Sequence, residues 1–398
     1  MMRIRNLAGV ILLAVLMLAG CGGGGGGGAV APTTTVVSGV AAKGPIRAGT
    51  VKVYAIVNGI EDRSAPLGQG QTDGNGNYSV DAGSYAGPIL VEVSGGSYTD
   101  EVSGATVTLT APLRAIISGA TTGSQTVAVT PLTELAYKKA LGGGLLTAAS
   151  IDDANATIAS FFKLTDIITS LPIAGSADDN QKKYAFVLGS FAQLANDNKN
   201  AGESLDDAQA RHITRIGDEI KASGGISTST LTQLNNAISA FTAGGRNQTG
   251  SSITPISAPT SGLLKLSSAG TPNTIGAIDI TINLPAGVVI NYDQATGEAG
   301  AGVVTVSGVA ATGSNQLSLA KYTPAAGAAP AQLHVVLINA AGFGLGEFAT
   351  IRFDLGAGAS FPGSAGEFTI ASFSPKGLSG STLTGITASA ASIGLALN

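Results

Sequence analysis

The chain contains no tryptophan, two histidines and one cysteine among its 398 residues. A single cysteine excludes disulfides and cysteine-based metal sites within the chain. Charged residues make up 12% of the sequence, whereas about 25% is usual for soluble proteins. The 21 basic and 25 acidic residues give a net charge of −4. This balance argues against a nucleic-acid-binding protein, which needs a clustered basic surface.

Small residues are abundant instead. The sequence has 57 glycines and many alanine, serine and threonine residues. Low charge together with a neutral Ser/Thr surface is typical of an extracellular protein, and the length allows two or three domains. Without disulfides, stability must come from the burial of apolar side chains.

The first 28 residues have the pattern of an export signal. Arg3 and Arg5 precede an almost wholly apolar stretch over 6–20, and Cys21 and a run of glycines follow. Fifteen helical residues span roughly 22 Å, less than the roughly 30 Å hydrocarbon core of a membrane. This length favours a secretory signal. A short transmembrane anchor or a buried helix remains the alternative.

The residues Leu-Ala-Gly-Cys at 18–21 resemble the lipobox of bacterial lipoprotein signals at every position. The resemblance implies a signal peptide over 1–20, cleavage between Gly20 and Cys21, and lipid on Cys21. One acyl chain holds a protein only marginally, so two or three chains would give a durable membrane anchor. Gly22, rather than Asp, follows the cysteine, which implies the outer membrane of a diderm bacterium, on its periplasmic or cell-surface face.

The glycine-rich residues 21–35 cannot bury apolar surface, so we expect a flexible tether there. Loss of residues 1–20 would remove two of the 21 basic residues and no acid, which lowers the net charge from −4 to −6.

Residues 36–129 have the pattern of a β-domain. Short alternating segments, such as 51–56, are separated by Gly- and Asn-rich turns, such as 72–78. The turn residues around 37–51 and 72–78 resemble carboxypeptidase-regulatory-like, transthyretin-like modules. The resemblance implies an N-terminal Ig-like β-sandwich with a structural role.

Asp73, Asn75 and Asn77 have the one-three-five spacing of a calcium loop. An EF-hand loop also needs Gly at its sixth position and an acid at its twelfth, where this chain has Tyr78 and Ser84. A hairpin turn is therefore favoured over a calcium site, and the three residues are only weak metal candidates. The sequence indicates no other cofactor.

Residues 130–245 predict a central helical bundle of five helices. Thr130, Ser150, Ser176, Ser204 and Thr228 mark their starts, and apolar residues recur at helical spacing behind each. His212 falls on the fourth helix, one residue from the apolar stripe. We expect it on the helix surface among charged neighbours, and not as a catalytic base.

Residues 246–260 are rich in Gly, Ser, Thr and Pro and predict an interdomain linker. The β pattern returns over 261–398, where eight or nine strands suit a jelly-roll or Ig-like sandwich. Apolar and polar residues alternate over 278–284 and again over 349–355. The almost continuous apolar run at 333–338 predicts a strand covered on both faces.

This C-terminal segment resembles the cohesin and carbohydrate-binding-module superfamily. The residues that carry the resemblance lie at 278–282, 289–293 and 344–353, and in the strand that begins at Phe368. Gln294 stands where cohesins have proline. Cohesins bind calcium-loaded dockerin modules, so the resemblance implies a C-terminal cohesin-like jelly-roll that binds a protein.

The sequence predicts no catalytic site. His334 lies in an apolar strand without a second His or Cys partner, and no nucleophile motif accompanies His212. The acidic residues of the last domain are scattered, and the pattern neither places nor excludes a hydrolytic pair. A non-catalytic surface lipoprotein that binds a protein or assists envelope assembly is the favoured interpretation. Binding of a polysaccharide by the C-terminal domain ranks lower because the chain lacks tryptophan, and a hydrolase ranks lower still.

A Cys21→Ser variant tests the anchor. Without the thiol no lipid attaches, so the protein should move from the membrane pellet to the soluble fraction when cells are lysed and centrifuged. Ser38→Ala, a change outside the signal, should leave the protein in the pellet. Unchanged sedimentation of Cys21→Ser would contradict the prediction.

Overall fold

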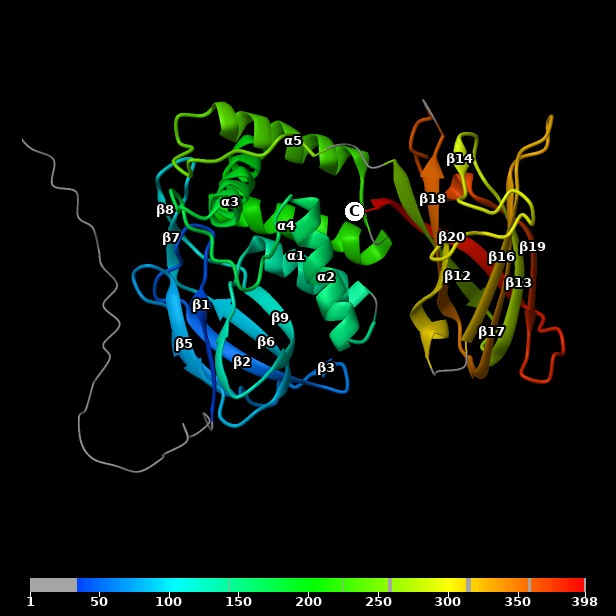
Figure 1. The fold of residues 1–398 in the computed structure, drawn as a ribbon, viewed down its shortest axis with the longest axis horizontal. Coiled ribbons are helices and arrows are strands. Elements are labelled where there is room, and N and C mark those ends of the chain that lie inside the picture. Colours follow the sequence, from blue (N-terminus) through cyan, green and yellow to red (C-terminus); the bar gives the residue numbers. More distant parts are fainter. Residues whose placement is uncertain are drawn as a thin grey trace, which may run out of the picture. The chain divides into compact units, whose positions relative to one another are not determined.

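The computed structural model describes residues 34–142, 144–223, 225–256, 260–312, 316–356 and 359–396. Their fold is a mixture of β and α structure with several antiparallel sheets and five helices (Figure 1). The predicted signal and tether lie before residue 34, outside the described residues. Within the described part of the chain, no helix combines the length and hydropathy needed to cross a membrane.

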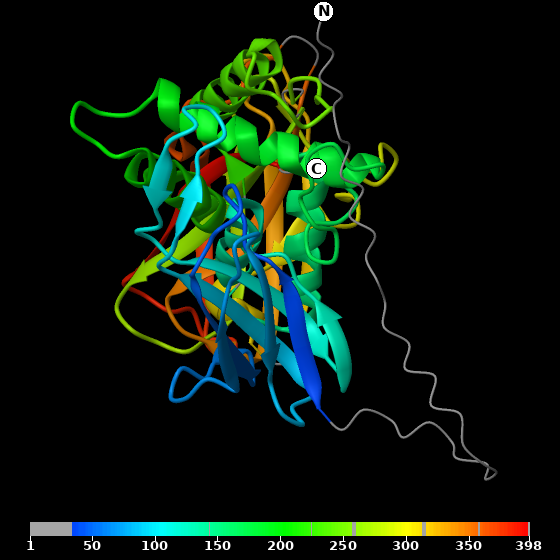
Figure 2. The ribbon, with the colours of Figure 1, turned by 90° about the vertical axis from the view of Figure 1, so that its left-hand side faces the viewer.

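Two facing sheets form the N-terminal β part, which Figure 2 turns toward the viewer in blue and cyan. One sheet has the order β10-β1-β5, with β1 parallel to β10, and the other has the order β3-β2-β6-β9, with β4 beside β2. A separate hairpin, β7–β8, completes it. The strands are β1 (Thr35–Val40), β2 (Thr50–Val57), β3 (Ile60–Glu61), β4 (Gly68–Gln71), β5 (Asn77–Asp81), β6 (Gly87–Ser94), β7 (Ser97–Thr99), β8 (Thr106–Thr108), β9 (Leu113–Ala120) and β10 (Gly123–Thr126).

Five helices follow, each within a segment for which the sequence predicts one. Thr130 caps the first, since its hydroxyl accepts the backbone N–H of Leu132 and of Thr133. The second begins earlier than Ser150, because Thr147 is its cap. The helices are α1 (Pro131–Gly142), α2 (Ala148–Phe161), α3 (Asp179–Asp197), α4 (Leu205–Ser223) and α5 (Thr228–Ala243).

The β part and the helices share one hydrophobic core. Buried side chains from β2 and β6, such as Val53 and Leu90, belong to the same cluster as Leu135 of α1 and Phe191 of α3. The sequence predicts a sandwich and a bundle as separate segments. Because buried side chains of both segments belong to one cluster, the described residues of 34–256 share a common interior.

A buried ion pair crosses this interior. The Lys43 ammonium lies 2.6 Å from Oδ1 of Asp206 in α4, and the two side chains are 1% and 0% exposed. The Tyr98 hydroxyl donates to the same oxygen at 2.9 Å. Both the backbone N–H and the hydroxyl of Thr110 donate to Oδ2. Asp206 thus has a donor for each oxygen, as a buried carboxylate requires.

The protonation of the pair follows from these contacts. Burial opposes the charge on Asp206, but the Lys43 ammonium and the Thr110 donors together hold the pKa of Asp206 below its usual value. Burial lowers the pKa of Lys43, and the charge of Asp206 opposes this shift.

A second ion pair joins β9 to α1. Arg114 donates to both carboxylate oxygens of Glu134, at 2.8 Å and 3.0 Å, and its guanidinium lies over the ring of Tyr137. Burial raises the pKa of Glu134 to about 7 although the positive charge of Arg114 opposes the rise. The sandwich and the helices are therefore joined by charged contacts as well as by the core.

The predicted linker over 246–260 packs on the helices along 246–256. Ile253 and Ile256 are buried in the core shared with the helices. The amide of Asn235 donates to the Ile256 carbonyl at 2.9 Å and accepts its N–H at 2.7 Å. Composition suggested a linker because Gly, Ser and Thr dominate, but two isoleucines are enough to attach the segment. Residues 257–259 lie outside the described part.

The C-terminal β part also has two sheets, drawn from lime-green and yellow to red in Figure 1. One has the order β11-β20-β12-β18-β14, with β15 beside β18, and the other has the order β16-β17-β13-β19. All their pairings are antiparallel. The strands are β11 (Gly225–Ile226), β12 (Ser261–Gly270), β13 (Ile275–Asn283), β14 (Val288–Val289), β15 (Val304–Val306), β16 (Gln316–Thr323), β17 (Gln332–Phe343), β18 (Gly346–Leu355), β19 (Thr369–Lys376) and β20 (Ile386–Ala396).

Residues of both sheets face each other in a second core. Ile278, Ile280 and Ile282 of β13 are buried, and the residues between them are half-buried or exposed, as their alternation predicts. The prediction that 333–338 is covered on both faces is wrong. In β17 Leu333, Val335 and Leu337 are buried, whereas His334 and Ile338 are exposed. A continuous apolar sequence can therefore form a strand that is buried on one face and exposed on the other.

The buried ion pair makes a testable contribution to stability. Asp206→Ala leaves the Lys43 charge, the Tyr98 hydroxyl and the Thr110 donors without their acceptor. We expect the free energy of unfolding, measured with urea, to fall by about 3–5 kcal/mol. Asp153→Ala is the matched control, since it breaks a 2.5 Å pair with Lys139 in which Asp153 is 68% exposed. It should cost less than about 1 kcal/mol. Equal losses would contradict the prediction.

Candidate functional site

The outer face of the β16-β17-β13-β19 sheet carries side chains that are turned away from the core. Because paired residues in a sheet point to the same side, the register arranges this face in rows. From β16 to β19 the rows are Leu317, Ile338, Ala277 and Lys376; Leu319, Val336, Asp279 and Ser374; Lys321, His334, Thr281 and Ser372; and Thr323, Gln332, Asn283 and Thr369. We call this set of residues the outer face.

One corner of the outer face is apolar. Leu317, Leu319 and Ile338 are 50%, 59% and 41% exposed, and Val336 lies beside them. Three large aliphatic side chains in neighbouring positions form a continuous apolar patch, not isolated exposures. Loss of this area from water on binding would be favourable.

A hollow of about 360 Å³ opens beside the patch. Leu319 and Val336 supply apolar lining, and Lys321 and His334 supply polar groups. Glu298 and Ala299, which bridge to β16 through the backbone, bound the hollow at the edge of the sheet. Apolar lining with a few polar groups is the usual composition of a binding site.

His334 and Asp279 form the polar centre of the outer face. His334 Nε2 lies 2.9 Å from Oδ1 of Asp279, and the two side chains are 46% and 53% exposed. An exposed pair of this kind contributes little to stability. The pair lies next to Lys321, so this part of the face presents charges of both signs to a partner.

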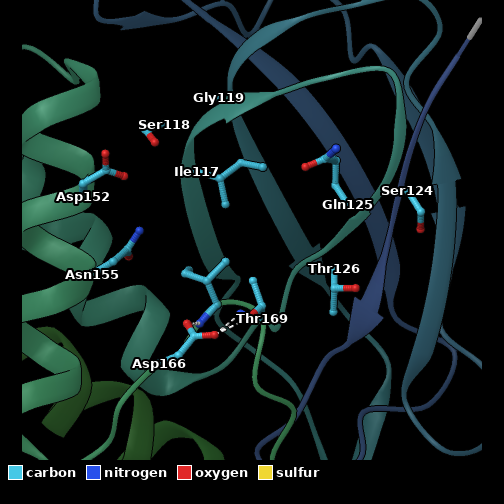
Figure 3. Close-up of a pocket in the computed structure, with 11 residues that line it drawn as sticks. Ile117, Ser118, Gly119, Ser124, Gln125, Thr126, Asp152, Asn155, Asp166 and Thr169 are labelled. Atoms are coloured by element: carbon cyan, nitrogen blue, oxygen red, sulfur yellow. Dashed lines mark hydrogen bonds between the residues drawn. The ribbon is translucent and has the colours of Figure 1, made fainter.

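A second hollow, of about 520 Å³, lies in the N-terminal part and is shown in Figure 3. Asp152 and Asn155 of α2 line one side, and the loop after α2 adds Asp166 and Thr169. The other walls come from the end of β9 and from β10. They consist of Ile117, Ser118, Gly119, Ser124, Gln125 and Thr126.

Asp166, Thr169 and the side-chain nitrogen of Asn155 are hydrogen-bonded within the chain, whereas the buried Oδ1 of Asn155 has no partner among the described residues. Asp166 accepts the backbone N–H of Ile168 at 2.7 Å and of Thr169 at 2.9 Å, and it also accepts the Thr169 hydroxyl, as the dashed lines in Figure 3 show. The Asn155 amide donates to the carbonyl of Ile116. Asp166 thus stabilises its own loop, so it is poorly placed to act as a base toward a substrate.

The loop that holds the weak calcium candidates is a hydrogen-bonded turn. Oδ1 of Asp73 accepts the backbone N–H of Asn75 and of Asn77 at 2.8 Å, and Oδ2 accepts the Asn77 amide at 3.0 Å. These contacts lower the pKa of Asp73, the Asn77 side chain contributing most. Gly76 has a φ of 80°, which glycine adopts without strain. Asp73, Asn75 and Asn77 therefore form a hydrogen-bonded turn, in which the Asp73 carboxylate accepts hydrogen bonds from the chain itself.

The prediction that His212 lies on the helix surface is wrong. His212 is 2% exposed, packed among residues of α4 and the segment before it. Burial, then the charges of Arg211 and Arg215, lower its pKa to about 4. Arg211 itself binds Glu203 at 2.8 Å. The flanking arginines suggest a solvated position, but their guanidinium groups lie 3.5 Å from the two ring nitrogens of His212, and Arg215 also donates to Thr230 and Gln233 of α5. The imidazole is therefore covered by the same side chains that make the sequence look charged.

Gly20 and Cys21, the predicted cleavage and lipidation residues, lie outside the described residues. Among the described residues, no group of three or more His, Cys, Asp or Glu side chains is close enough to hold a metal ion.

Comparisons with known proteins give little. No family model matches the sequence, and no curated protein matches it. A non-cellulosomal cohesin from the archaeon Archaeoglobus fulgidus is similar over 32% of this chain and 75% of its own, at 14% identity and a TM-score of 0.20. A 9R-lipoxygenase from Cyanothece PCC8801 is similar over 42% of this chain and 27% of its own, at 14% identity and a TM-score of 0.15. With TM-scores this low, neither likeness supports a function for this chain.

Sequence reasoning missed the apolar corner. The sequence predicts a strand over 317–322, in which Leu317 and Leu319 alternate with Ser318 and Ala320. Leucines would ordinarily face the core. The structure instead places Tyr322 inward, so the leucines of odd number point outward. Tyr322, an aromatic residue at an even position of the strand, could have indicated that the even-numbered side chains face the core.

The pKa of His212 gives a prediction about pH. The pKa of a histidine in an unfolded chain is about 6.5, whereas the fold lowers the pKa of His212 to about 4. Because the folded state favours the neutral form, this group's contribution to stability is complete above the unfolded pKa. It is lost as the pH falls from 6.5 toward 4.

With only two histidines in the chain, proton NMR can follow each ring separately. We expect the chemical shifts of the His212 ring protons to stay constant down to about pH 5 and to change with a midpoint at about pH 4. His212→Gln should also flatten the loss of unfolding free energy between pH 6.5 and 4. A His212 midpoint near pH 6.5 would disprove the burial argument.

Proposed function

We propose that this protein is a non-catalytic lipoprotein, anchored in the outer membrane through lipid on Cys21, that binds a protein partner with the outer face of its C-terminal sheet. In this proposal the tether and the N-terminal part are structural, and the Ig-like, transthyretin-like and cohesin-like resemblances describe the two β parts. The observation that carries the binding role is the exposed apolar corner at Leu317, Leu319 and Ile338.

The composition of the face supports a protein partner. Aliphatic side chains surrounded by polar ones, here Lys321, His334 and Asp279, have the pattern of an interface core with a polar rim. The hollow between Leu319 and His334 is of a size that can accept one projecting side chain of the partner.

Carbohydrate binding is the alternative. Sugar sites usually place an exposed Trp, Tyr or Phe ring against the sugar, and none of the positions in the rows of the outer face is one of these residues. Tyr322, the aromatic residue of β16, is buried and packs against Tyr292. The outer face therefore favours a protein over a polysaccharide. For a hydrolase, neither hollow offers an activated nucleophile.

The test compares capture of envelope proteins by the wild-type chain and by Leu319→Glu. A charge in the centre of the apolar corner should reduce capture of a specific partner by tenfold or more, because a buried unpaired charge costs at least about 1.4 kcal/mol. Leu378→Glu is the matched control, since Leu378 is also 59% exposed but lies in the turn between β19 and β20.

Capture that is equal for the wild type and both variants would contradict the proposed surface. Binding to polysaccharide that survives Leu319→Glu would favour the alternative. Thermal unfolding of each variant checks that the substitution changed the surface and not the fold.

A further inference from the structure

The Lys43 side chain has few hydrogen bonds for a buried amine. An ammonium carries three donors, and among the described residues Oδ1 of Asp206, at 2.6 Å, is the one acceptor that Nζ meets. The centroid of the Tyr98 ring lies 5.3 Å from Nζ and adds a cation–π contact. Because Lys43 is 1% exposed, solvent covers little of its remaining N–H groups. The charge is therefore costly to keep there, and a neutral group with one N–H would avoid most of this cost.

The Asp206 carboxyl, in contrast, receives donors from outside the pair at both oxygens. Oδ2 accepts the backbone N–H of Thr110 at 2.7 Å and its hydroxyl at 2.6 Å. Oδ1 accepts the Tyr98 hydroxyl at 2.9 Å. Two donors on one oxygen are the arrangement that stabilises the oxyanion of a tetrahedral intermediate in acyl transfer. Thr110 would therefore stabilise the charge that forms on Oδ2 when a nucleophile attacks Cγ.

The Lys43 amine lies within reach of that carbon. Since Nζ is 2.6 Å from Oδ1 and a carbon–oxygen bond is about 1.2 Å long, Nζ lies no farther than about 3.8 Å from Cγ. Reacting atoms in productive arrangements are about 3–3.5 Å apart. Burial lowers the pKa of Lys43, which favours the neutral amine, the nucleophilic form.

From this geometry we propose that Lys43 and Asp206 condense to an isopeptide bond, an amide between Nζ and Cγ that links the N-terminal β part to α4. Nζ first gives one proton to Oδ1 along their contact. Its lone pair then attacks Cγ, and the carbonyl electron pair moves to Oδ2, where the Thr110 donors stabilise it. When this pair returns, the Cγ–Oδ1 bond breaks, and Oδ1 takes a second proton from Nζ and leaves as water. An ammonium and a carboxylate thus become one amide and one water molecule, and no co-reactant is needed.

The fold favours this condensation in two ways. It holds both groups in contact, which makes the reaction intramolecular and is equivalent to a high effective concentration. The product also removes two charges from the interior, together with the cost of keeping them from water. Although burial opposes it, the Lys43 charge and the Thr110 donors hold the pKa of Asp206 below its usual value. The neutral pair is therefore the minor form, which limits the rate, but each chain needs the reaction only once.

The bond would close a loop between residues 163 positions apart. A cross-link of this kind restricts the unfolded chain and so stabilises the folded one. In the bonded chain Asp206→Ala would remove the cross-link as well as the ion pair, and the loss of unfolding free energy would exceed the value expected for the ion pair alone. The site is separate from the outer face and does not depend on the proposed function.

The experiment is mass spectrometry of the Cys21→Ser chain, which lacks the thiol and so carries no lipid on it. After purification and unfolding in urea, its intact mass should lie below the value given by its sequence by the mass of one water molecule. Trypsin should not cleave after Lys43, and the digest should contain a branched peptide that joins Lys43 to Asp206.

Three controls accompany the measurement. Lys139 and Asp153 also lie 2.5 Å apart, but Asp153 is 68% exposed, so no branched peptide should join them. Lys43→Arg keeps the positive charge without a primary amine, and its mass should match its sequence. Thr110→Val, a change at an exposed residue, removes the hydroxyl donor and keeps the backbone N–H. It should slow the appearance of the bonded form after cell-free synthesis about tenfold or more.

The proposal is overturned if the wild-type chain, folded by circular dichroism before it is unfolded, has the mass of its unmodified sequence. It is also overturned if the water is lost within a single unbranched peptide, as in a cyclic imide of one aspartate. If Thr110→Val forms the bond as fast as the wild type, the role assigned to the Thr110 hydroxyl is wrong.

Discussion

Lys43 and Asp206 are 163 positions apart in the sequence and meet in the interior. Bringing two charges out of water costs more than their attraction returns unless every remaining donor and acceptor is paired. The Tyr98 hydroxyl and both donors of Thr110 meet this requirement at Asp206. These contacts tie α4 to three separate segments of the N-terminal β part, at Lys43, at Tyr98 of β7 and at Thr110 after β8.

Lys43, which lies 2.6 Å from Asp206, also acts on a second acid, Glu101. Its positive charge opposes the rise in the pKa of Glu101 that burial and Asp100 cause. The two acids near Lys43 differ in their hydrogen bonds. Both oxygens of Asp206 accept donors, whereas Oε2 of Glu101 has no hydrogen-bond partner among the described residues.

Much of the secondary structure could be read from local patterns. The alternation at Ile278, Ile280 and Ile282 identified a one-sided strand, and capping residues such as Thr130 and Ser204 marked helix starts, because these features depend only on nearby residues. The face of 333–338 could not be read, since an unbroken apolar run carries no alternation. His212 was misplaced for a related reason. The charged residues beside His212 in the sequence indicate an exposed helix face, but they do not determine whether the imidazole itself is exposed.

The candidate sites depended on contacts between distant residues. The outer face exists because three strand registers align Leu317 with Ile338 and Ala277, and no local pattern specifies a register. Thr110 and Asp206 meet although 96 positions separate them in the sequence. Composition also did not reveal that Ile253 and Ile256, within the predicted linker, are buried in the core shared with the helices.

In the C-terminal β part the last strand pairs with an early one, since β20 runs antiparallel along β12 from Gly262–Leu395 to Gly270–Ile386. Contacts between residues this far apart form late in folding, because closing a long loop costs entropy. Domains dominated by such contacts fold in roughly milliseconds to seconds. Until β20 arrives, one edge of β12 stays open, with its backbone donors and acceptors free to pair with another chain. Dilution or a chaperone during this interval would therefore affect the yield of folded protein more than the stability of the finished sheet.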